Sequence, residues 1–272
     1  MEFLHTWALL PQGVYPTDLR TTYIAHAGGD VYGRIPLKKA GKLEYTAYYG
    51  IRSFDDREGY YYYAIDAGFD ITAISGHTTG WDLKWTTPVK GLMLGTSWAD
   101  LTMHRAGSWV IGPFAGTQYT IDATANRPWV GYGDYNRGKW EFSSEYRSNG
   151  NLEVVRFINI GTFPPMPYVQ STETWFAAAA YRVTPKLQVG VYHSNLHVDS
   201  PKTPTNTASN HIYDEVGTAR YDVNSHWEVK VEGHFMDGYG DIYSAQGFYS
   251  RSNTQGLKPK TNMLVLRTSY NF

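Results

Sequence analysis

The sequence predicts an all-β fold, an antiparallel up-and-down transmembrane β-barrel with roughly 12 strands in this chain. Three observations predict it. Apolar and polar residues alternate along much of the chain, short turns alternate with long polar segments, and aromatic residues make up 16% of the 272 residues. No stretch approaches the roughly 20 apolar residues of a membrane helix. The mean hydropathy of −0.43 fits a barrel, whose lipid-facing residues alternate with polar lumen residues.

The N-terminal half contains two clear hairpins. Residues 31–37 and 42–49 alternate in polarity and are joined by the short link Lys38–Gly41. Residues 81–85 and 92–98 alternate in the same way around a Pro-Val-Lys-Gly turn. Each pair therefore predicts two adjacent antiparallel strands with one apolar face.

The middle of the chain repeats this unit twice. A strand near residues 129–134 turns through Tyr-Asn-Arg-Gly and returns over residues 140–147. Residues 175–183 are mostly apolar at odd positions and turn through Thr-Pro-Lys into residues 187–191. Turn residues of these types between alternating runs are typical of hairpins.

The C-terminal part has the clearest alternation. Residues 217–223 turn at Asn-Ser into residues 227–235, which place Trp, Val, Val, Gly and Phe on one face. The other face of that strand carries His, Glu, Lys, Glu and His. The last strand, residues 264–272, ends on an aromatic residue, as the closing strand of an outer-membrane barrel habitually does.

Long polar segments separate the hairpins. They are residues 52–79, 99–118, 159–172, 198–212 and 238–260. Tight turns at one end and long loops at the other are the pattern of bacterial outer-membrane barrels. Residues 97–105 are compatible with a short helix inside one of these loops.

Composition limits the class of protein. The chain has no Cys, which excludes disulfides and thiol chemistry, and its net charge of −1 argues against nucleic acid as a partner. We expect one domain over residues 1–272, with residues 1–27 as a loop or partial N-terminal segment and residues 28–272 as the barrel strands.

Charges of both signs recur on the polar faces of the predicted strands. We predict that they line a lumen, where opposed charges create a transverse field across water. The predicted pore-lining residues are Arg34, Glu44, Lys84, Glu141, Glu145, Arg147, Arg182, Arg220, Asp222, Glu228, Lys230, Glu232 and Arg267. The plainer interpretation is that these residues pair with one another and stiffen the wall, and both can hold.

Aromatic residues near strand ends predict the two interfacial girdles of a membrane protein. The predicted girdle residues are Trp81, Trp98, Trp140, Trp175, Trp227, Tyr270 and Phe272. A soluble β-sandwich would show the same alternation. The density of charges on one face and of aromatics on the other favours the membrane interpretation.

Sites for chemistry are weakly supported. The nine His residues show no metal-ligand spacing, because His226 and His234 lie eight residues apart on one strand face. Ser143, Ser144 and Ser194 have no catalytic partner that the sequence identifies. The run Tyr60–Tyr63 is most simply a loop packed on its neighbours. We expect no enzyme activity, no metal and no cofactor.

Three segments resemble Gram-negative outer-membrane porins. They are Phe3–Gln12 followed by Val14–Pro16, the run Asp30–Arg34, and the terminal Tyr270–Phe272. In porins the first of these follows several N-terminal strands. The resemblance therefore implies an N-terminally truncated chain without a signal peptide, from a barrel of 16 or so strands.

The resemblance also implies a function. A porin is a water-filled channel in the bacterial outer membrane through which small hydrophilic solutes and ions diffuse passively. The implied partners are outer-membrane lipid, these solutes and a homotrimer. Two alternatives remain at this point: an outer-membrane barrel enzyme resembling a phospholipase, and a soluble β protein that binds carbohydrate.

Overall fold

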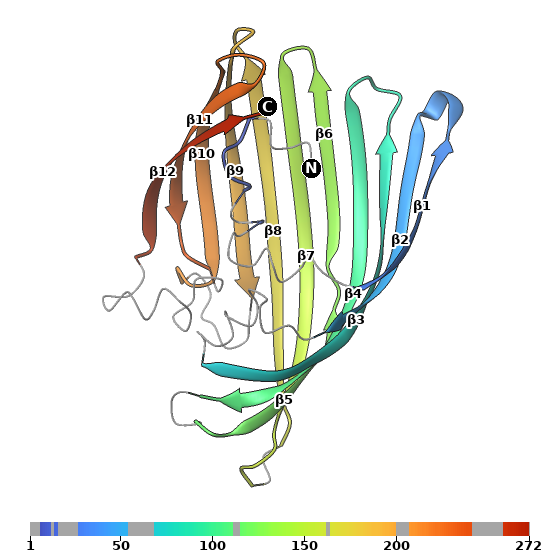
Figure 1. Cartoon of the computed structure of the whole chain (residues 1–272), viewed down its shortest axis with the longest axis vertical. Coiled ribbons are helices and arrows are strands. Elements are labelled where there is room, and N and C mark those ends of the chain that lie inside the picture. Colours follow the sequence, from blue (N-terminus) through green and yellow to red (C-terminus); the bar gives the residue numbers. More distant parts are fainter. Residues whose placement is uncertain are drawn as a thin grey trace.

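The computed structural model describes residues 6–11, 14–15, 27–53, 68–110, 115–161, 164–199, 207–240 and 258–271, with the backbone alone at residues 124–125. Over these residues the protein is all-β, and one antiparallel sheet contains 12 strands (Figure 1). The predicted fold class, antiparallel order and strand number are confirmed.

The strands follow one another along the chain, with one 3-10 turn between the first two. They are β1 (Ala27–Pro36), η2 (Lys38–Ala40), β2 (Lys42–Ser53), β3 (Phe69–Thr86), β4 (Leu92–Trp109), β5 (Gln118–Asn126), β6 (Trp129–Arg137), β7 (Trp140–Phe157), β8 (Met166–Arg182), β9 (Leu187–Asp199), β10 (His211–Asp222), β11 (Trp227–Asp237) and β12 (Lys260–Tyr270).

Strands β5 and β6 share one place in the sheet. Both lie between β4 and β7, so they form a single long strand that is interrupted at Arg127 and Pro128. Pro128 has no N–H to donate to a ladder. Its carbonyl still accepts from the N–H of Ala99 at 3.1 Å, and the N–H of Arg127 donates to the carbonyl of Gly150 at 3.3 Å. The sheet therefore stays continuous across the break.

The predicted contrast between short turns and long loops is confirmed. Five short turns connect β1 to β2, β3 to β4, β6 to β7, β8 to β9 and β10 to β11. Glycine permits the tight geometry of the first, because Gly41 has a φ of 94° and a Cβ there would lie 2.1 Å from the carbonyl oxygen of Thr86. The longer connections join the opposite ends of the strands.

The strands extend further into the predicted loops than the sequence indicated. Strand β3 begins at Phe69, β4 runs to Trp109 and β8 begins at Met166. The predicted short helix over residues 97–105 is wrong, and β5 was not predicted. These extensions contain polar and glycine residues that obscure the alternation. The turn nevertheless fixes the register of each hairpin, and backbone pairing continues in that register into the extensions.

The ends of the strand order are β1 and β12. Within the described residues neither pairs with the other, so the sheet is open along these two edges. The sheet is strongly curled, and the described N-terminal residues lie inside its curve (Figure 1).

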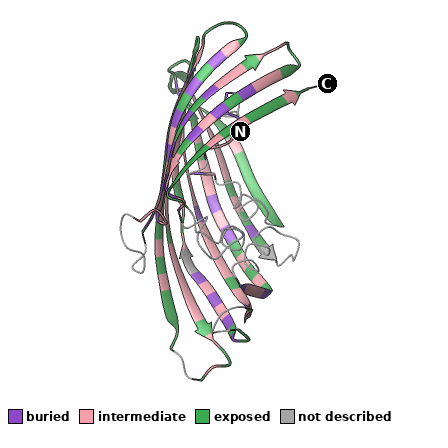
Figure 2. Cartoon of the chain, turned by 90° about the vertical axis from the view of Figure 1, so that its left-hand side faces the viewer, coloured by how far each residue is buried: buried purple, intermediate pink, exposed green. Residues whose placement is uncertain are grey.

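Burial alternates along the strands, as the period of a strand requires (Figure 2). On β9, Gln188 and Ser194 are fully buried, whereas Val191 on the other face is 62% exposed. We call the face that residues 6–11 and 14–15 contact the inner face, and the opposite one the outer face.

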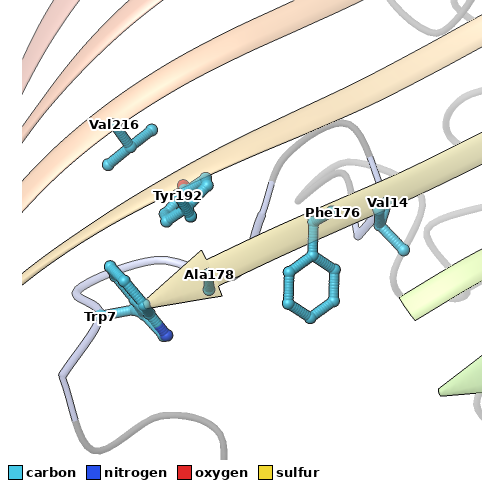
Figure 3. Packing of buried hydrophobic residues seen from close by; sticks show 6 residues of the cluster. All are labelled: Trp7, Val14, Phe176, Ala178, Tyr192 and Val216. Atoms are coloured by element: carbon cyan, nitrogen blue, oxygen red, sulfur yellow. The ribbon is translucent and has the colours of Figure 1, made fainter. Parts of the chain in front are cut away.

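The main apolar cluster lies on the inner face. Trp7 and Val14, from the N-terminal residues, pack with side chains of β8, β9 and β10 (Figure 3). The members of this cluster are Trp7, Val14, Phe176, Ala178, Tyr192 and Val216, with Tyr15 against it. Residues 1–27 were predicted as a loop or partial N-terminal segment, and within them residues 6–11 and 14–15 have a defined position against the sheet.

Candidate functional site on the inner face of the sheet

Register places all the predicted pore-lining residues on the inner face. Residues directly opposite in an antiparallel ladder share a face, and Arg34 faces Glu44, which faces Lys84. The same level continues through Gly95, Tyr132 and Glu145 to Phe176 of the apolar cluster. The rest follow by alternation along β7 to β12. That they line a water-filled pore stays a prediction.

Four cations occupy one level across β8 to β12. Arg182 faces Gln188, which faces Arg220, then Lys230 and Arg267. The level nearer the turns is acidic, with Asp222 facing Glu228. Ion pairs join these two levels: Arg182–Asp222 at 2.9 Å, Arg220–Asp222 at 2.7 Å, Arg220–Glu228 at 2.9 Å and Lys230–Glu228 at 3.1 Å. These contacts support the plainer interpretation of mutually paired wall charges for this part of the face.

The carbonyls of residues 6–8 bind side chains of β10 to β12. The hydroxyl of Thr218 donates to the carbonyl of Thr6 at 3.4 Å, and the ammonium of Lys230 donates to that of Trp7 at 3.3 Å. The guanidinium of Arg267 donates to the carbonyl of Ala8 at 3.2 Å. The strands thus satisfy three consecutive carbonyls of a segment that has no ladder of its own.

Glu232 binds the N–H groups of the same segment. Its carboxylate accepts from Ala8 at 2.8 Å and from Leu9 at 3.2 Å. The Nε2 atom of His234 lies 3.0 Å from the same carboxylate, and its Nδ1 atom lies 2.8 Å from Asp214. The imidazolium form satisfies both contacts, because both of its nitrogens carry a donor. All three side chains are fully buried.

Trp7 sits edge-on against Tyr192, with ring centroids 5.0 Å apart. Gly190 makes room for it, because a Cβ there would lie 2.9 Å from the indole carbon Cη2. Because Gly190 has no side chain, the indole ring of Trp7 can occupy this space. No feature of the sequence links these two residues, which are far apart along the chain.

Tyr15 anchors the other end of the segment. Its hydroxyl donates to the carboxylate of Glu145, and the guanidinium of Arg147 lies 5.3 Å from the ring centroid. Burial and the neighbouring carboxylate raise the pKa of the Tyr15 hydroxyl above its ordinary value. Tyr15 therefore stays neutral and remains a donor at physiological pH.

A cavity of about 270 Å³ remains beside the segment. It lies between Trp7 and the inner side chains of β2 to β7. Its lining includes the charged residues Lys42, Glu44, Lys84, Asp134 and Glu141. The hydroxyl of Thr6 donates to Glu141 at 3.4 Å, so the segment forms one wall of this space.

The outer face carries the predicted girdle residues that the structure describes. Trp227 faces Tyr270, Trp81 faces Trp98, and Trp140 and Trp175 are 48% and 36% exposed. Phe272 lies outside the described residues. On β7, outward Trp140 and Tyr146 lie six positions apart, roughly 20 Å along the strand. Tyr181 of β8 lies beside Trp140, and Trp175 lies beside Tyr146. These pairs form two rows of aromatic side chains, with the middle of the strands between them.

Metal-binding clusters and membrane-spanning helices were sought in the described part of the chain. No group of three or more His, Cys, Asp or Glu side chains there is arranged to hold a metal ion. No helix among those residues is long and apolar enough to cross a membrane. Of the serines considered above, Ser144 donates to the carbonyl of Phe176 at 2.9 Å, which is a structural contact within the ladder. Tyr60–Tyr63 lie outside the described residues.

Sequence reasoning missed several inner-face residues. Tyr132 packs over Gly95 and donates to Asp82 at 2.9 Å. Asp214 contacts His234, and residues 6–11 and 14–15 lie against the inner face. The alternation placed Tyr132 on a predicted strand and Asp214 shortly before one. Only the register of the strand pairs shows which side chains the two residues contact.

The chain was compared with known proteins. No protein-family model matches it, and no curated protein matches it. Among solved structures it is similar to one described as "CymD monoaromatic hydrocarbon channel", at 10% identity and a TM-score of 0.37, over 98% of this chain and 85% of the other. A similarity at this level supports no argument about shared function. Membership of the porin family therefore stays a prediction.

Proposed function

We propose that the protein is an outer-membrane porin, a water-filled channel for passive diffusion of small hydrophilic solutes. The observation that carries the proposal is the contrast between the two faces of one curled sheet. The inner face holds charges of both signs around a cavity, and the outer face holds exposed apolar side chains between two aromatic rows.

The outer face fits lipid better than water. Val191 and Phe235 are 62% exposed, and Leu264 and Leu266 are 77% and 73% exposed. On β11 the outward side chains run from Trp227 to Phe235 without a charge, roughly 26 Å along the strand. A soluble protein rarely exposes so large a contiguous apolar surface, and an outer-membrane barrel has an apolar band about 25 Å tall.

The inner face supports passage of solutes rather than chemistry. Its charges largely pair with each other or bind residues 6–9 and Tyr15, and the remaining cavity is polar. In this proposal the protein is not an enzyme, and its partners are outer-membrane lipid and small hydrophilic solutes. A homotrimer is the assembly that the porin resemblance implies. In this proposal residues 6–11 and 14–15 narrow the channel, because they contact part of the inner face.

Planar bilayer recording of the full-length protein tests the proposal. Protein folded in detergent should add stepwise ion conductance, and liposomes containing it should swell in small sugars. The matched control is Glu215→Gln, which changes a charge on the outer face beside His193 and leaves the inner face intact. Folded protein that inserts into bilayers without conductance would overturn the channel function. Folding in plain buffer without detergent would overturn the membrane location.

A further inference from the structure

The cavity beside Trp7 is built by one level of the sheet. Lys42 of β2 faces Thr86 of β3, which faces Met93 of β4. The level continues to Asp134 of β6, Ser143 of β7 and Ala178 of β8. All six residues line the cavity. Its walls are therefore fixed by ladder register, which makes it a site built by regular structure.

The charges around the cavity are separated by sign. On the β2–β3 side, Glu44 pairs with Lys42 at 3.0 Å and with Arg34 at 3.2 Å, so these three groups carry a net positive charge. Lys84 adds a third cation there, and it has no ion-pair partner among the residues that the structure describes. On the β6–β7 side the lining charges are Asp134 and Glu141, both acidic.

The separation matches the size of a small dipolar molecule. Three strand spacings separate Lys42 from Asp134, which is roughly 14 Å between backbones. Both side chains project into the space between, so the gap between the charged groups is shorter than this. The volume of about 270 Å³ lies just below the roughly 300–1,000 Å³ of ordinary small-molecule sites. The cavity therefore suits solutes of the size of an amino acid or a dipeptide.

Trp7 supplies a further feature of recognition. Its ring forms part of the cavity wall and is itself held by Tyr192 and by the contacts of residues 6–9. An indole face attracts a cationic group that lies over it. A ligand ammonium directed toward the acidic side thus gains a second favourable contact.

We infer that this cavity binds small zwitterionic solutes, with the solute carboxylate toward Lys42 and Lys84 and its ammonium toward Asp134 and Glu141. The inference rests on the proposed channel function and names its preferred solute class. A net positive charge on one side of the narrow space and a net negative charge on the other favour a dipolar solute over a neutral solute of equal size, and over a solute with one net charge.

Liposome swelling with matched solutes tests the inference. The probes are glycylglycine, a zwitterion, and N-acetylglycinamide, a neutral molecule of similar size. We expect glycylglycine to enter faster by about fivefold, on the order of what two weak, solvated ion pairs supply. The variants Lys84→Gln and Asp134→Asn should each reduce this preference, and the outer-face variant Glu215→Gln should keep it.

The exchange variant Lys84→Asp with Asp134→Lys gives the sharpest readout. It keeps the number of charges of each sign, but Arg34, Lys42, Glu44 and Glu141 stay in place, so the net charge on each side of the cavity falls to about zero. The preference for the zwitterion should therefore be lost, although no charge has been removed. A preference that persists in this variant would overturn the inference. Heat-dependent mobility on SDS gels confirms that each variant is folded. Equal entry of both probes through a conducting wild-type protein would overturn the inference alone. Failure of both probes and of ion conductance would overturn the proposed channel as well.

Discussion

At the scale of single residues, Glu232 joins the N-terminal residues to the inner face of the sheet. One buried carboxylate accepts from the N–H groups of Ala8 and Leu9 and contacts His234. Hydrogen bonds to an ionised group are stronger than neutral ones, roughly 1.5–3 kcal/mol each. Glu232 was predicted as one lumen charge among many, and the structure shows that it binds the N-terminal segment.

We expect Glu232→Gln to loosen residues 6–9. The amide NH₂ replaces one acceptor, so an N–H of the segment loses its partner, at a cost of about 2 kcal/mol. Limited proteolysis with mass analysis should then detect faster cleavage within residues 1–15. Glu215→Gln, on the outer face, is the control. Equal cleavage of Glu232→Gln and wild type would show that the carboxylate does not hold the segment.

Gly190 offers a second test at this scale. Gly190→Leu fills the seat of the indole and should displace Trp7 into water, because the nearest obstacle is a buried ring and the carbonyl of Ala179. The measurement is the part of the tryptophan emission that disappears in a Trp7→Phe background, which should shift to longer wavelength. Gly233→Leu is the control, since a Cβ there meets nothing within 4 Å. An unshifted Trp7 emission in Gly190→Leu would contradict this packing.

At the scale of the element, each strand directs alternate side chains to the inner face and to the outer face. On β12, Leu266 is exposed on the outer face beside Val231, and Val265 lies on the inner face opposite Glu232. The two positions are adjacent in sequence and have similar apolar side chains. They therefore form a matched pair for testing which face meets lipid.

We expect Leu266→Arg to destabilise the protein in liposomes by about 2–4 kcal/mol, the cost of a charge at the middle of a bilayer. Val265→Arg should cost much less, because its charge enters the polar inner face. Urea titration of the folded fraction, followed by heat-dependent gel mobility, measures both. A larger loss for Val265→Arg would reverse our assignment of the faces.

At the scale of the whole molecule, the curled sheet holds residues 6–11 and 14–15 on its inner face, and β1 and β12 are its edges within the described residues. A bilayer does not tolerate unpaired backbone groups. In the membrane these two edges must therefore find partners, either each other or further strands. The segment meanwhile occupies space through which solutes would pass.

Deleting residues 1–15 should increase the single-channel conductance, by about twofold or more if the cavity beside Trp7 is the narrowest part. The deletion removes contacts of Lys230, Glu232 and Arg267, so it should also lower the thermal stability. Bilayer recording of the deletion beside wild type gives the comparison. Unchanged conductance would mean that the segment lies outside the path of ions.

Much of the fold could be predicted because successive side chains of a strand point to opposite faces, so the two environments of the strand appear as alternating residue types. The strand over residues 227–235 and its partner at 217–223 are found in the structure as β11 and β10. Strand β5 was not predicted although Tyr119, Ile121 and Ala123 alternate with polar residues, because Pro128 separates it from the predicted strand near residues 129–134. The position of residues 6–11 and 14–15 was not predicted because a segment without periodicity gives no sign of what it will contact.

The sequence by itself determined the antiparallel strands, the asymmetry of turns and loops, and the side of each strand on which a charge or an aromatic lies. These are local properties, set by a period of two and by turn residues. Only the tertiary structure decided which charges meet. Ala8 and Glu232 lie 224 residues apart in sequence. Their contact depends on the register of every strand pair between the N-terminal segment and β11, and on the curvature of the whole sheet. The inner-face cavity and its separated charges depend on the same registers and curvature, which no single segment of sequence determines.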